Sequence, residues 1–218
     1  MVRETLIPGE NDGNSPGREP GAELPLRPVW VHLAFVFTFL FMLLHVYWAV
    51  GGTWGLPLLA RHDKSAVQAV NWVVSAIMLF GALFVLALNR RTDSRVRAWV
   101  LLAPMWIAAV VCVSHAFYGF VTKALYLSGH HGAVDFPVVP GVGAAEAAEA
   151  NHLSAVQDLL VFEPCFLVQG VVLSLAAWQF IRTRNARRRW WTSLVVGIVV
   201  IDVFGALLSV AGARFALS

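Results

Sequence analysis

WVHLAFVFTFLFMLLHVYWAVGGTWG, residues 30–55, is almost wholly apolar until it reaches a glycine-rich turn. The run from Trp30 to Val50 has the ~20 residues that a helix needs to cross the hydrocarbon core of a bilayer. His45 lies inside the run. A titratable side chain at membrane depth is costly and therefore marks a candidate functional site. The stretch predicts a first membrane span that carries part of such a site.

Similar apolar runs recur along the rest of the chain. The sequence is 58% hydrophobic and only 13% charged, whereas soluble domains carry about 25% charged residues. We therefore predict an all-α, polytopic membrane helix bundle with five transmembrane helices. The predicted spans are residues 30–50, 67–88, 99–120, 158–181 and 190–210.

The two longest segments outside these spans have compositions of their own. Residues 1–28 are polar and rich in Pro and Gly, a composition that predicts a disordered tail, and residues 29–212 form the predicted transmembrane domain. Residues 122–157 form the predicted outer loop. Strong helix formers at 144–150 predict a short interfacial helix there. The capping-box spacing of Ser154 and Gln157 predicts that the fourth span begins at this point.

The distribution of basic residues predicts the orientation. With a cytoplasmic amino terminus, 12 of the 16 Lys and Arg residues fall on the cytoplasmic side, as the positive-inside rule requires. We expect the carboxyl terminus outside. Membrane topology explains the basic residues, so we expect membrane lipids and no nucleic acid as partners. Assembly into a homo-oligomer or a larger membrane complex is a further alternative for its partners. The Arg- and Ala-rich composition suggests a bacterial plasma membrane protein.

Polar side chains recur at one depth near the outer ends of four spans. They lie roughly 6–8 Å inside the predicted span ends at 1.5 Å per residue. The side chains are His45, Asn71, His115 and Glu163. Each could be a snorkelling or helix-bridging group, but together they predict one shared polar pocket in the outer leaflet. Tyr47 and Trp48 could form its wall.

Several functions fit such a pocket. The first is binding or conduction of a proton, a metal ion or a small ligand. The second is a membrane enzyme that acts on a lipid or isoprenoid, with Glu163 and Asp202 as catalytic carboxylic acids. Alternatively, His45 and His115 could ligate haem or copper, because imidazole suits both. The third is an accessory subunit of a membrane complex. The sequence identifies no cofactor, metal or reaction.

The two cysteines lie inside apolar runs. We interpret Cys112 and Cys165 as small buried hydrophobic residues, since free cysteine is often buried. A disulfide between their helices stays open.

One motif carries a family resemblance. The pattern His45-x-Tyr47-Trp48-Ala49-x-Gly51-Gly52-x-Trp54-Gly55, followed later by Glu-Pro-Cys-Phe-Leu at 163–167, resembles the DUF3995 group of small bacterial integral membrane proteins. The resemblance implies a membrane helix bundle and supplies no activity.

Overall fold

The computed structural model describes residues 29–57, 64–89, 95–136 and 138–210. These residues form helices and turns and contain no strand. The predicted tail at 1–28 and residues 211–212 of the predicted domain lie outside the described residues. The helices are α1 Val29–Ala49, α3 Lys64–Ala87, α4 Arg95–Leu127, α5 Ala144–Gln157, α6 Glu163–Phe180 and α7 Arg184–Val210. A short 3₁₀ turn spans His131–Ala133, and a π-helical segment, Asp158–Phe162, joins α5 to α6.

The predicted fold class is confirmed. Within the described ranges, five helical stretches are long and apolar enough to cross a membrane. They are α1, α3, α4, the continuous α5–α6 stretch and α7.

Several boundaries differ from the sequence prediction, among them the start of α7 at Arg184 instead of residue 190, and two of the differences bear on the site. α4 runs on to Leu127, past the expected end at 120, and stops at Gly129, whose φ is +102°. There the Gly129 and His130 N–H groups bond the carbonyls of Tyr126 and Leu125, a Schellman cap that suits glycine. The capping-box prediction at Ser154–Gln157 is wrong. The chain is already helical at these positions, and Ser154 is buried inside the helix.

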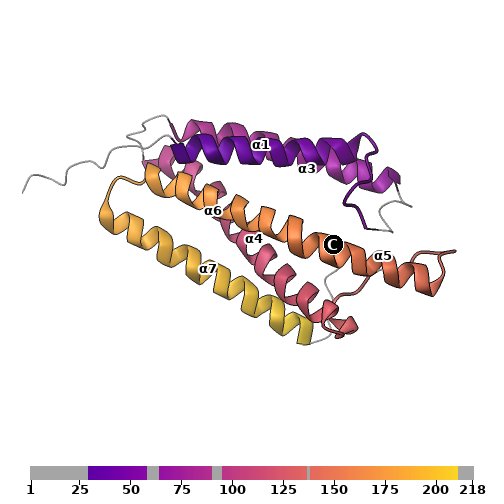
Figure 1. Ribbon diagram of the computed structural model, residues 1–218. Coiled ribbons are helices and arrows are strands. Elements are labelled where there is room, and N and C mark those ends of the chain that lie inside the picture. Colours follow the sequence, from indigo (N-terminus) through magenta and orange to yellow (C-terminus); the bar gives the residue numbers. More distant parts are fainter. Residues whose placement is uncertain (1–28, 58–63, 90–94, 137, 211–218) are drawn as a thin grey trace, which may run out of the picture.

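The helices lie in the order α3, α1, α6, α4, α7, so that α6 lies between α1 and α4 (Figure 1). α1 pairs with α3, and α4 pairs with α6. Gly170 of α6 allows the second pair to approach closely, because a Cβ there would press on the Val113 side chain and the Ala109 carbonyl of α4. Small residues at a helix interface are the usual basis of association in lipid.

The two ends of the bundle are packed differently. We name them the α6–α7 end, where α6 ends and α7 begins, and the α4–α5 end, where α4 ends and α5 begins. The apolar core lies at the α6–α7 end, with Ala34, Val85, Met105, Ala177 and Leu194 contributed by the five spans in turn. Polar and aromatic contacts replace it toward the α4–α5 end.

α7 packs mainly on α4, and near its start the Arg187 guanidinium also lies 4.4 Å from the Trp178 ring of α6. Gly197 lies against the Trp106 ring, and the Trp106 Nε1 donates to Ser193 Oγ at 3.1 Å. The opposite face of α7 is apolar and exposed, as Val199 and Val203 show. Such a face suits contact with lipid acyl chains.

Candidate functional site

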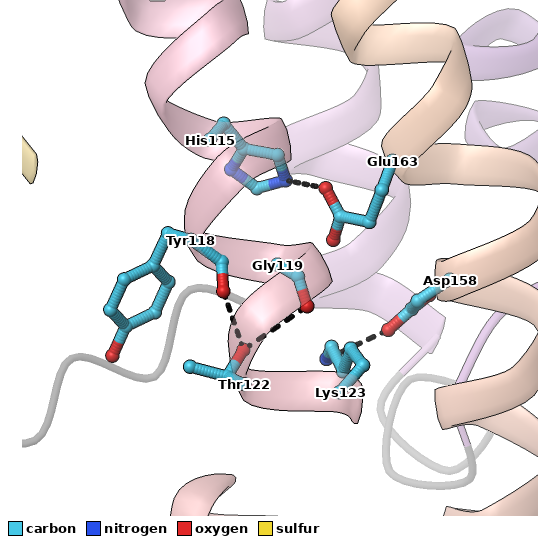
Figure 2. A network of polar contacts seen from close by, with 7 residues as sticks. All are labelled: His115, Tyr118, Gly119, Thr122, Lys123, Asp158 and Glu163. Carbon is cyan, nitrogen blue, oxygen red and sulfur yellow. Dashed lines mark hydrogen bonds and ion pairs between the residues drawn. The ribbon is translucent and has the colours of Figure 1, made fainter. Parts of the chain in front are cut away.

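A histidine and a glutamate face each other between α4 and α6. The His115 Nε2 lies 3.7 Å from Glu163 Oε2 (Figure 2). Glu163 is only 3% exposed, and its Oε2 has no hydrogen-bond partner among the described residues. The His115 side chain is 31% exposed. A buried polar atom without a partner is rare in proteins and requires an explanation.

Gly119 makes room for the Glu163 carboxyl group. It lies one turn beyond His115 on the same face of α4, and a Cβ at this position would overlap the Glu163 carboxyl oxygens. Any residue other than glycine would therefore displace the carboxyl group from its place beside His115.

An ion pair lies one turn further along the same face. The Lys123 Nζ is 2.8 Å from Asp158 Oδ2 (Figure 2). Lys123 is 5% exposed, which is unusual for lysine unless it is paired. The Phe136 ring, from the connection between α4 and α5, lies 5.5 Å from the ammonium group. Lys123 is therefore enclosed by Asp158 and Phe136.

The π-helical segment places both carboxyl groups toward α4. In a regular α-helix, residues five positions apart are rotated by about 500°, so the side chains of Asp158 and Glu163 would point roughly 140° apart. In the wider π turn, the Glu163 N–H bonds the Asp158 carbonyl five residues earlier. The two side chains then lie one turn apart and meet Lys123 and His115 respectively. Single π turns of this kind often occur at functional sites.

A second pair, His45 with Asn71, joins α1 to α3; we call this pair and the His115–Glu163 pair the two histidine pairs. The His45 Nδ1 is 2.7 Å from Asn71 Oδ1, while Asn71 Nδ2 donates to the Val67 carbonyl at 2.8 Å. The Asn71 oxygen is thus the acceptor for His45, so the Nδ1 of His45 carries a proton. In the neutral ring the Nε2 then keeps its lone pair.

Two phenylalanine rings separate the histidine pairs. The ring of Phe41 lies 5.3 Å from that of His45 and 5.3 Å from that of Phe166, centroid to centroid. Phe166 lies 4.1 Å from His115. The sequence predicted one shared pocket for His45, Asn71, His115 and Glu163. The structure places them as two pairs on opposite sides of the two rings.

The polar atoms of Tyr47 and Trp48 are engaged in the turn after α1. Trp48 Nε1 donates to the Trp54 carbonyl at 2.7 Å, and the Trp54 N–H donates to the Tyr47 hydroxyl at 3.3 Å. Gly52 lies directly under the Tyr47 ring. These contacts give both side chains a role in shaping the turn, beside the predicted role as a wall.

The same turn rests on the π-helical segment. Gly55 has φ +78°, and a Cβ there would overlap the Phe162 ring. The Trp48 ring also contacts Phe162, with 5.7 Å between ring centroids. The His-x-Tyr-Trp motif therefore holds the end of α1 against the segment that carries Asp158.

The remaining candidates are Asp202 and the two cysteines. Asp202 of α7 approaches Ser114 on α4, and Ser114 follows a different face of α4 from Gly119 and Lys123. Cys112 and Cys165 are both free and half-buried. No group of three or more His, Cys, Asp or Glu side chains suited to a metal ion occurs in the part of the chain that the structure describes.

Three residues of this site were not predicted from the sequence. Gly119, Lys123 and Asp158 look like ordinary span and loop residues there. The four-residue spacing of His115, Gly119 and Lys123 could have indicated a shared helix face. A buried contact between Gln169 Nε2 and Thr38 Oγ1, 2.6 Å long, also joins α6 to α1 and was not predicted.

Comparison with known proteins identifies a family. The sequence model of the family described as "Protein of unknown function (DUF3995)" matches residues 38–173. Neither the curated proteins nor the solved structures yield a match. The matched range covers the turn after α1, both histidine pairs and the Lys123–Asp158 ion pair. Because it spans more than half of the 218 residues, the chain belongs to the DUF3995 family.

Proposed function

We propose that this membrane protein binds and releases a proton at Glu163, with His115 as the neighbouring group that shares in the exchange. The observation that supports this proposal is the buried Glu163 carboxyl group, 3% exposed, whose Oε2 lacks a hydrogen-bond partner and lies 3.7 Å from His115 Nε2. An ionised carboxyl group buried without a donor is costly. Proton binding relieves that cost.

The contacts favour a proton over a metal ion. A proton needs one acceptor and one titratable neighbour, and the pair supplies both. A structural or catalytic metal ion takes three or four protein ligands, whereas the His115–Glu163 pair supplies two. The Phe41 and Phe166 rings keep His45 apart from this pair.

We further propose that the α4–α5 end faces the outside of a bacterial plasma membrane, with the amino terminus in the cytoplasm. The arginines between α6 and α7 and at the start of α7 support this orientation. Glu163 precedes Phe180, the last residue of α6, by 17 residues, or about 26 Å of helix. With a hydrocarbon core of about 30 Å, the carboxyl group lies in the outer leaflet.

Infrared difference spectroscopy of the protein in lipid vesicles tests the proposal. A pH titration of the wild type should show the carbonyl band of a protonated, buried carboxylic acid growing as the pH falls. Glu163→Gln should remove this band. Glu149→Gln, which changes an exposed glutamate on α5, should leave it in place. A band that persists in Glu163→Gln would rule out Glu163 as the binding group.

A further inference from the structure

We propose that the Lys123–Asp158 ion pair closes the path between the outer solution and Glu163, so that proton exchange requires the pair to open and occurs from the α4–α5 end alone. This inference rests on the proposed function of Glu163. It adds the side of exchange and the element that controls it.

The first support is the position of the pair. His115, Gly119 and Lys123 follow one face of α4 at four-residue intervals, and Asp158 lies one turn before Glu163 on the facing helix. The ion pair therefore lies between the His115–Glu163 pair and the α4–α5 end (Figure 2).

The second support is the burial of Lys123. Its side chain is 6% exposed, whereas that of Asp158 is 25% exposed. Asp158 thus reaches the solution, and the Lys123 ammonium group lies behind it, between the α4 and α6 helices. A buried ammonium group requires its partner, so breaking the ion pair must carry Lys123 toward water. This movement takes Lys123 away from the turn of α4 that follows Gly119 and removes the ion pair on that side of Glu163.

The third support is the packing toward the other end. Between Glu163 and the α6–α7 end, α6 contributes Leu173, Ala176 and Ala177 to the apolar core, where they meet Ala34 and Ala109. Each of these five residues is at most 4% exposed. Closely packed apolar side chains leave neither the space nor the polar partners that a bridging water needs. The core therefore blocks exchange from the α6–α7 end.

The test measures how fast Glu163 responds to a pH jump. The protein is inserted in vesicles in one orientation, and its carboxylic acid infrared band is followed after a jump on either side. The wild type should respond to a jump at the α4–α5 side and should lag behind after a jump at the other side. Lys123→Ser, which removes both the charge and the bulk, should speed the response by at least about tenfold, a barrier lower by about 1.4 kcal/mol.

Two variants serve as controls. The double variant Lys123→Asp with Asp158→Lys restores an ion pair and should return the rate toward that of the wild type. Lys64→Ser removes an exposed lysine at the start of α3, on the same side, and should leave the rate unchanged.

Three results would overturn the inference. One is an equal response of the wild type to jumps on the two sides, a comparison that needs no variant to fold. The second is a wild-type rate in Lys123→Ser. The third is a wild type whose Glu163 never titrates, and that result alone would also overturn the proposed function.

Discussion

Gly119 has only a hydrogen atom where every other residue has a Cβ. In a regular helix, alanine is more stable than glycine by about 1 kcal/mol. Gly81→Ala on α3 should show this gain, since nothing lies within 4 Å of a Cβ there. Gly119→Ala should instead turn the Glu163 carboxyl group away from His115, because the new methyl group takes its place.

The displacement can be measured without removing a polar group. We expect Gly119→Ala to shift or abolish the Glu163 infrared band, while Gly81→Ala keeps it and raises the thermal unfolding temperature. An unchanged band in Gly119→Ala would show that the carboxyl group does not occupy the space beside this glycine.

The tautomer of His45 is a second prediction at this scale. Asn71 accepts a hydrogen bond from the His45 Nδ1, so ¹⁵N NMR should find the proton of the neutral ring on Nδ1. Asn71→Leu removes the acceptor and should move this proton to Nε2. Ser75→Ala, which alters only the hydroxyl bond to the Asn71 carbonyl, should leave the tautomer as it is. An Nε2 proton in the wild type would contradict the contact.

At the scale of the elements, the π-helical segment decides which residues face α4. Its five residues occupy one turn, so deleting the exposed Leu160 should convert it to α-helix and keep Asp158 and Glu163 on one face. Deleting the exposed Val168 from the regular part of α6 should instead rotate everything before it by about 100°.

The two deletions form a matched pair for thermal unfolding and infrared spectroscopy. The variant lacking Leu160 should unfold near the wild-type temperature and keep the Glu163 band. The variant lacking Val168 should unfold at a lower temperature and lack the Glu163 band, since His115 and Lys123 no longer meet their partners. Equal damage from the two deletions would argue against the π turn as the device that sets the register.

The spans were predictable because length and hydropathy alone decide whether a helix can cross a bilayer. The end of α4 and the continuity of α5 with α6 were not, because they depend on tertiary contacts. Lys123 resembles a loop residue in the sequence, and only the folded structure shows that Asp158 and Phe136 enclose it. The π turn arises from one extra residue in an otherwise regular helix, which no local propensity indicates.

The polar side chains of the candidate site could be picked out from the sequence, and their pairing could not. His45, Asn71, His115 and Glu163 stand out as polar residues inside apolar runs, although His115 lies 12 residues before the end of α4 at Leu127 and not five residues before a span end. Which of them meet depends on the order of the helices and on helix rotation. Phe41 and Phe166, which separate the two pairs, are ordinary apolar span residues in the sequence.

Considered as a whole, the molecule has an apolar core at one end and polar pairs at the other. The proposed orientation puts the polar end outside, and cysteine labelling in intact cells checks it. In a background where Cys112 and Cys165 are alanine, we expect a membrane-impermeant maleimide to label His131→Cys. Arg188→Cys, also at an exposed position, should react only after the membrane is permeabilised. The reverse pattern would invert the proposed topology.

The central claim, that Glu163 binds the proton, is tested most directly by the equilibrium infrared titration of the wild type against Glu163→Gln in lipid. We expect the band of a buried carboxylic acid that grows as the pH falls, shifts in D₂O and is missing from Glu163→Gln. A titration in which the two proteins give the same spectra at every pH would contradict it.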